Sequence, residues 1–304
     1  MRRKALSLLL LSLLIGVATQ LTAVQATYHY SFSYAPNNRQ WFDSVYEEEV
    51  TNYTVQWIAY QFAAYGRLLY YSSYYINAQP VDYIYPLGSA EHNSNIDHIA
   101  FFTKGHTYQG PPYVHQKPHW AHMCHTTGNY VWDLQIAALA TGKTKLAVVW
   151  HCGTAQSYIQ WSSMICDTCG KYYSWPMAYT KYNGMSLDGY NNPSTGAPYA
   201  FIGFWGYSEQ FLSNFGLDYP WYYYHFVAYF YQMLVQNQFT INDAIDQACF
   251  ASSGDWWPLH WLSQYKAGWD PDGPNGGPNG NLPPWDTQGK ILGNGDAHYP
   301  GYPW

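Results

Sequence analysis

Charged side chains are scarce in this chain, and the basic ones are the scarcer kind. Only 11% of the 304 residues are charged, with 13 Lys and Arg against 19 Asp and Glu, which gives a formal net charge of −6 at pH 7. A protein that binds the phosphate backbone of nucleic acids needs a concentration of basic side chains. The composition therefore argues against nucleic acid as a partner.

The apolar stretch at the amino terminus is too short to cross a membrane. Three basic residues precede the run from Ala5 to Ala18, and small residues surround Gln25 where a signal peptidase would cut. A membrane-spanning helix needs about 20 apolar residues. We therefore expect a signal peptide over residues 1–26, a secreted chain with no membrane span after cleavage, one α/β domain over 27–296 and a short tail over 297–304.

Cysteines are few, and their number is odd. The five are Cys124, Cys152, Cys166, Cys169 and Cys249. An odd number in a secreted protein leaves at least one thiol unpaired unless chains are cross-linked. If Cys152 is the free one, Cys166 and Cys169 can close a small loop and Cys124 and Cys249 remain as partners, although the sequence does not fix the connectivity.

Aromatic residues are abundant instead, at 20% of the chain, with 33 Tyr and 15 Trp. Much of the surface must then be uncharged, polar and aromatic. Such a surface suits stacking against glycans or contact with other proteins. The simpler interpretation is a tyrosine-rich secreted chain without such a ligand, because Tyr is readily half-buried.

Hydrophobic periodicity and turn residues predict strands that alternate with helices. The expected strands cover residues 28–34, 68–72, 96–103, 146–150, 198–204 and 289–292, and the expected helices cover 44–66, 131–140, 218–235 and 240–248. The first helix begins with a capping-box pattern, Ser44 followed by Glu47. Residues 72–96, 106–128, 167–194 and 268–284 are expected to be irregular. Because parallel strands need crossovers, the order predicts an α/β fold with a mostly parallel sheet of about six strands and helices on both faces.

Two of the predicted strands end at a reactive side chain. The segment NIDHIAFFTKGH ends at His106, and KLAVVWHC ends at Cys152. The carboxyl ends of strands in an open α/β sheet share one rim, so an imidazole and a thiol would meet there. A neighbouring imidazole is the usual activator of a thiol that is otherwise mostly protonated at neutral pH. Since adjacent strand residues point to opposite faces, His151 is expected to have a structural role.

These strand ends, with PYAFIGFW after them and KILGNGD near the end, resemble the caspase-like superfamily of cysteine peptidases, which includes gingipains and legumains. The resemblance covers about residues 28–296. It implies that His106 is the general base or acid, that Cys152 is the nucleophile, and that the backbone amides of Cys152 and Thr107 form the oxyanion hole. The family usually has Gly directly after this His, whereas this chain has Thr107, whose side chain could crowd the oxyanion site.

Other interpretations remain open. Taken singly, His106 and Cys152 are also typical of polar ends of buried strands, which would leave an inactive relative that uses its aromatic surface for binding. A third hypothesis is a metal-binding protein. Imidazole and thiolate ligands in the loop of His115, His119, His122, Cys124 and His125 could hold zinc, or else calcium, although the spacing matches no recognised pattern.

The cysteine chemistry itself requires no cofactor, and its substrate would be a peptide or protein. Side-chain preference would be set near the end of the strand at 198–204, where Glu209 and Asp188 are available acids. Either one at the base of a pocket would favour Arg or Lys before the cleaved bond. A solvated surface carboxylate is the alternative for both.

Overall fold

The computed structural model describes residues 31–36, 45–65, 68–75, 78–96, 98–110, 119–124, 129–151, 154, 175–180, 200–204, 208, 211–212, 222–253 and 289–293. A six-stranded sheet forms its centre, in the order β2-β1-β3-β7-β8-β9. Its strands are β1 (Ser31–Pro36), β2 (Leu68–Tyr75), β3 (His98–Lys104), β7 (Thr144–Trp150), β8 (Ala200–Phe204) and β9 (Gly289–Gly293). The first five are parallel to one another, and β9 pairs antiparallel with β8.

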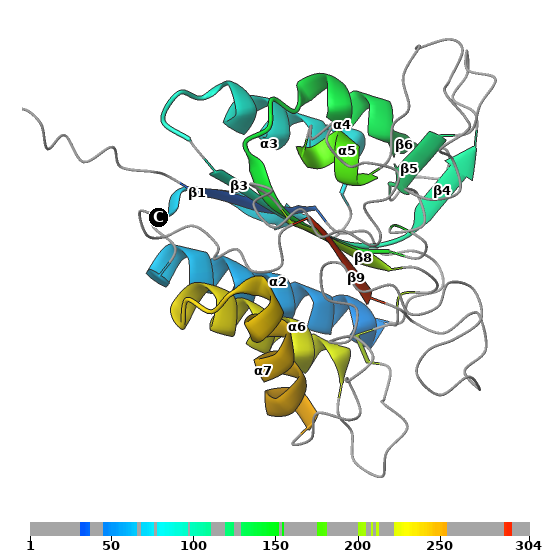
Figure 1. The fold of residues 1–304 in the computed structure, drawn as a ribbon. Helices are drawn as coiled ribbons and strands as arrows, with labels where there is room; N and C mark the ends of the chain where they lie inside the picture. The colour runs from blue at the N-terminus through cyan, green and yellow to red at the C-terminus, as the bar shows by residue number, and fades with distance from the viewer. Residues whose placement is uncertain are drawn as a thin grey trace, which may run out of the picture.

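Helices cover both faces of this sheet (Figure 1). On one face lie α3 (Pro80–His92), α4 (Asp133–Leu139) and α5 (Trp175–Thr180). On the other lie α2 (Val45–Tyr65), α6 (Tyr223–Tyr231) and α7 (Ile241–Ser253), with a π-helical turn, η2 (Gln232–Gln236), directly after α6. The prediction of an α/β fold with a mostly parallel sheet and helices is confirmed.

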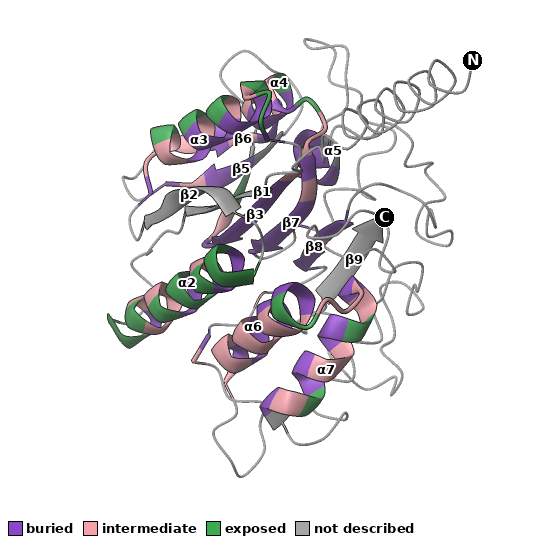
Figure 2. Ribbon diagram, turned by 90° about the vertical axis from the view of Figure 1, so that its left-hand side faces the viewer, coloured by how far each residue is buried: buried purple, intermediate pink, exposed green. Residues whose placement is uncertain are grey.

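The central strands are buried on both faces, as Figure 2 shows for β3, β7 and β8. Along β3, Ala100 and Phe102 belong to the core under α2, α6 and α7, whereas Ile99 and Phe101 belong to the core under α3, α4 and α5. Burial on both faces explains why these strands are continuous apolar runs rather than alternating ones.

A second, smaller sheet follows β3 where the sequence predicts irregular structure. It is antiparallel, in the order β4-β5-β6, and consists of β4 (Thr107–Gly110), β5 (His119–Met123) and β6 (Tyr130–Trp132). Its strands are too short and too rich in His and aromatic residues to give a clear period of two. The prediction of irregular structure throughout 106–128 is therefore wrong.

Three further predictions need correction. The proline-containing stretch before β3 holds α3, in which Pro80 occupies the first turn and Pro86 is accommodated inside the helix. The region predicted as a polar loop contains α5. The helix expected from Asp218 begins only at Tyr223 and changes to a π-helical turn at Gln232.

No helix in the described part of the chain is long and apolar enough to cross a membrane. The predicted signal peptide and the predicted tail lie outside the described residues.

Candidate active site at the carboxyl ends of β3 and β7

The two strands that the sequence analysis singled out are direct neighbours in the sheet. They run parallel, and the last residue of β3, Lys104, is aligned with the last residue of β7, Trp150. The amide of Gly105 extends this pairing by donating to the carbonyl of Trp150 at 3.4 Å. The chain therefore leaves both strands at the same level of the same edge. His106 and His151 follow at this edge, and Cys152 lies outside the described residues.

The backbone of His106 is held by the small sheet. Its carbonyl accepts a hydrogen bond of 3.1 Å from the amide of Met123, the last residue of β5. The side chain of His106 is neither fully buried nor fully exposed. The turn after β3 is thus fixed on both sides, by β7 at Gly105 and by β5 at His106.

The amide of Thr107 points away from β5. Hydrogen-bonded and non-hydrogen-bonded pairs alternate along an antiparallel ladder. The bond from Met123 to His106 makes theirs a hydrogen-bonded pair, so the next pair, Thr107 and His122, is of the other type. Since β4 is an edge strand, the Thr107 N–H is directed to the outer side of β4.

The side chain of Thr107 bonds to His151. Its Oγ1 lies 3.3 Å from Nδ1 of His151, while Nε2 of the same ring lies 3.3 Å from Oγ1 of Thr103. A neutral imidazole offers one donor and one acceptor, and a hydroxyl can take either role, so both contacts can be satisfied. The Thr107 hydroxyl is therefore hydrogen-bonded to the His151 ring.

His151 is fully buried on the α3, α4 and α5 side of the sheet. Burial lowers the pKa of His151 well below its ordinary value, and electrostatic interactions with His122, His106 and Lys104 lower it further, whereas a backbone hydrogen bond with His106 acts in the opposite direction. His151 is thus a neutral, hydrogen-bonded ring, in keeping with the structural role expected from strand alternation.

His122, one of the residues considered as a metal ligand, is packed in the core. Its ring stacks on Trp175 and Tyr83, with centroids 3.9 and 4.9 Å away, and meets the His151 ring edge-on at 4.9 Å. Its Nε2 lies 2.7 Å from the hydroxyl of Tyr179, and its Nδ1 has no hydrogen-bond partner among the residues that the structure describes. Burial lowers the pKa of His122 well below its ordinary value.

The metal site expected from the histidine loop is not assembled in the described part of the chain. No group of three His, Cys, Asp or Glu side chains in that part could hold a metal ion. His119 lies in β5, and His115 and His125 lie outside the described residues. Burial, together with the negative charge of Asp82, raises the pKa of the Cys124 thiol to about 12, which disfavours the thiolate that a metal would need.

The suggested pairing of Cys124 with Cys249 is wrong. Cys124 is a free thiol in the core under α3, α4 and α5, whereas Cys249 is buried in the core on the opposite side of the sheet. The sheet separates the two sulfur atoms. Cys166, Cys169 and the two acids suggested for the substrate pocket, Asp188 and Glu209, lie outside the described residues.

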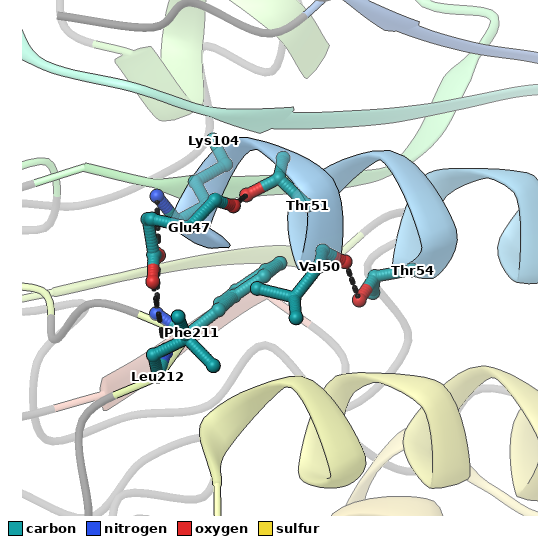
Figure 3. A network of polar contacts seen from close by, with 7 residues as sticks. All are labelled: Glu47, Val50, Thr51, Thr54, Lys104, Phe211 and Leu212. Carbon is teal, nitrogen blue, oxygen red and sulfur yellow. Dashed lines mark hydrogen bonds and ion pairs between the residues drawn. The ribbon is translucent and has the colours of Figure 1, made fainter. Parts of the chain in front are cut away.

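The structure also reveals a buried polar cluster that sequence reasoning missed. Lys104, the last residue of β3, forms an ion pair of 2.8 Å with Glu47 in the first turn of α2. The Glu47 carboxylate also accepts hydrogen bonds from the amides of Phe211 and Leu212 (Figure 3). We call Glu47, Lys104 and these two amides the Glu47 cluster. The signal in the sequence was a lysine at the end of the apolar run IAFFTK, because a buried ammonium requires a partner.

In comparisons with known proteins, no protein-family model and no curated protein matches the chain.

Proposed function

We propose that this chain is a secreted cysteine endopeptidase of caspase-like fold that uses His106 and Cys152. One observation carries the proposal: β3 and β7 are adjacent, parallel and aligned at Lys104 and Trp150. His106 and Cys152 each follow their strand's last residue by two positions. Extending the observed alignment by two residues would bring the imidazole and the thiol to the same place on the rim.

The order of elements gives further support. The resemblance noted from the sequence requires an apolar strand before the histidine, a neighbouring strand before the cysteine, and then another apolar strand with a glycine. β3, β7 and β8 are consecutive in the sheet, and Gly203 lies in β8. The helix and strand expected near the end of the domain correspond to α7 and β9.

The reaction would be acyl transfer in two halves. His106 takes the proton of the Cys152 thiol, and the thiolate sulfur attacks the peptide carbonyl carbon. The C–N bond then breaks, and the amine leaves with the proton held by His106. Water, deprotonated by His106, attacks the thioester, the C–S bond breaks, and the carboxylic acid and the free thiol are released.

The geometry of Thr107 favours the oxyanion role that the resemblance implies for its backbone. Its N–H is not used in pairing with β5, and its side chain is turned to His151. The crowding expected from a side chain at this position is relieved if the hydroxyl stays on that bond. One oxyanion donor is worth roughly 3 kcal/mol of the barrier. The oxyanion would lie between this amide and that of Cys152, and an acid at Asp188 or Glu209 would favour Arg or Lys in the substrate.

Thiol labelling tests this proposal directly. Iodoacetamide at neutral pH should modify Cys152 faster than any other cysteine, and His106→Ala should lower that rate at least tenfold without unfolding the chain. Cys124 provides an internal control, because its buried thiol should stay unmodified in the same sample. Peptide mapping by mass spectrometry locates the label. Equal rates for the native protein and His106→Ala would refute the dyad.

A second candidate is a catalytically silent relative that binds glycans or proteins through its aromatic surface. One observation favours it: α2 exposes large aromatic side chains along its outer side, at Tyr46, Tyr53, Trp57 and Tyr60. Their spacings of seven, four and three residues keep them on neighbouring positions of one helical face. Absence of selective labelling at Cys152, together with glycan binding that is lost in Tyr53→Ala, would establish this alternative.

A further inference from the structure

The Glu47 cluster is buried to a degree that is rare for charged side chains. The Glu47 side chain is 1% exposed and that of Lys104 is 8% exposed, and their charged atoms lie 2.8 Å apart. The two carboxylate oxygens accept hydrogen bonds of 2.5 Å from the amide of Phe211 and 2.9 Å from that of Leu212. A buried ion pair is stable only when its geometry is good and its remaining hydrogen-bonding groups are satisfied.

The cluster joins three parts of the chain that are far apart in sequence. Glu47 lies in α2, Lys104 ends β3, and the two amides follow the end of β8 by seven and eight residues. In Figure 3 the carboxylate lies between the lysine and these amides. An apolar replacement could not hold two successive backbone N–H groups, so the carboxylate fixes the course of the backbone at Phe211 and Leu212.

Phe211 connects the Glu47 cluster to the carboxyl ends of β3 and β7. Its ring lies under the Lys104 ammonium, 5.2 Å from nitrogen to centroid, and meets the ring of Trp150 edge-on at 5.4 Å. Lys104 is two residues before His106, and Trp150 is two residues before Cys152. The segment at 211–212 is therefore fixed against the two strand ends that carry the proposed dyad.

We propose that Glu47 and Lys104 are positioning residues that hold the segment at 211–212 as one wall of the peptide-binding cleft. This inference rests on the proposed peptidase function and deepens it. Neither residue takes part in bond making. They set the position of this wall relative to the ends of β3 and β7, so that their loss should misalign an extended substrate but should not affect a small reagent.

If Glu47 and Lys104 only stabilised the fold, their replacement would not slow a peptide reagent selectively. Two alkylating reagents distinguish this stabilising role from the proposed positioning role. Iodoacetamide reports the reactivity of the Cys152 thiolate alone. Tripeptidyl chloromethyl ketones with Arg, Asp, Asn or Leu beside the ketone must also occupy the cleft. The peptide that modifies the native protein fastest is then used for the variants. Loss of this wall should lower the rate at which the peptide reagent modifies Cys152 and should leave the rate with iodoacetamide unchanged.

The key variant is Glu47→Gln combined with Lys104→Met. It leaves no unpaired buried charge, and glutamine can still accept a bond from one of the two amides. The expected result is a peptide labelling rate at Cys152 at least tenfold lower, an iodoacetamide rate within twofold of the native one, and faster amide exchange at residues 211 and 212. Glu49→Gln, an exposed acid in the same helix, is the matched control and should change none of these rates.

The outcomes separate the two claims. Suppose that Cys152 of the native protein is labelled selectively and that the ratio of peptide to iodoacetamide rates is the same in the double variant. This result overturns the inference and leaves the peptidase proposal standing. Equal loss of both rates also overturns the inference, because it indicates a general effect on the thiol. If neither reagent selectively labels the native Cys152, the proposed function itself fails. Thermal unfolding of each variant identifies samples that are not folded. Glu47→Asp then serves as the second variant, because it keeps a negative charge near Lys104 but is too short to hold both amides, and it should lower the ratio of peptide to iodoacetamide rates in the same way.

Discussion

Acidification should destabilise this protein through two buried neutral histidines. His122 and His151 both have pKa values well below the ordinary 6.5 in the folded state because they are removed from water. The unfolded chain regains the ordinary pKa and so binds more protons than the folded chain as the pH falls below that value. The stability that these histidines contribute is thus fully present above pH 6.5 and is lost as the pH decreases towards their folded pKa values.

The size of this loss of stability follows from the difference between the pKa values of the histidines in the folded and unfolded chain. While the folded rings stay neutral, each histidine costs roughly 1.4 kcal/mol for each pH unit below the unfolded pKa. Lowering the pH from about 7.5 to about 5.5 should therefore remove roughly 2.7 kcal/mol of unfolding free energy for the pair. This is a large share of the ~5–15 kcal/mol that a typical native protein has.

Denaturant unfolding at several pH values measures this loss, and a variant isolates one histidine. His122→Phe keeps an aromatic ring between Tyr83 and Trp175 and removes one titrating group. Its pH-dependent loss should be about half that of the native protein, roughly 1.4 kcal/mol over the same range, although its stability at pH 7.5 is lower because Tyr179 loses a hydrogen bond. His92→Gln, which changes an exposed histidine, should leave the slope unaltered. Identical slopes for the native protein and His122→Phe would refute the reasoning.

Three further predictions concern single residues. Glu47→Ala leaves the ammonium of Lys104 buried without its partner and should lower the unfolding free energy by about 3–5 kcal/mol, whereas Glu49→Ala should change it by less than about 0.5 kcal/mol in the same denaturant titration. Thr107→Pro removes the proposed oxyanion amide, and an edge strand can accept a proline. The rate of peptide hydrolysis should fall about 10²–10³-fold, while iodoacetamide labelling of Cys152 continues. Unchanged hydrolysis would show that the Thr107 amide is not an oxyanion donor. Cys124, with its pKa of about 12, should resist maleimide at neutral pH until the protein is unfolded, and labelling of the native state would contradict its burial.

The parts of the fold that sequence reasoning predicted have strong local signals. The long helix α2 ends beside Gly66, β3 and β7 are unbroken apolar runs, and α7 begins where the side chain of Thr240 accepts a hydrogen bond from the Asp243 amide. Each signal lies within a few residues of the element that it predicts. The sequence does not predict α3, because this stretch contains prolines and has only a weak apolar pattern, although Pro80 marks the helix start and Pro86 is tolerated inside the helix.

The missed features of the site depend on contacts between distant residues. His151 is 44 residues from Thr107, and Phe211 is 164 residues from Glu47. No periodicity or spacing reports such pairs, because they exist only after the sheet has brought the strand ends together. A lysine at the end of a buried strand shows that a partner is required, but the sequence alone does not identify it as Glu47.

The antiparallel edge strand has a consequence for how the protein is made. β9 covers β8, yet more than eighty residues separate them, so β9 leaves the ribosome well after β8. Until then the outer edge of β8 offers unpaired backbone groups to any other extended chain. Nascent or truncated forms that end before residue 289 should therefore self-associate, and pairing of β9 with β8 should be a slow event because it closes a long loop.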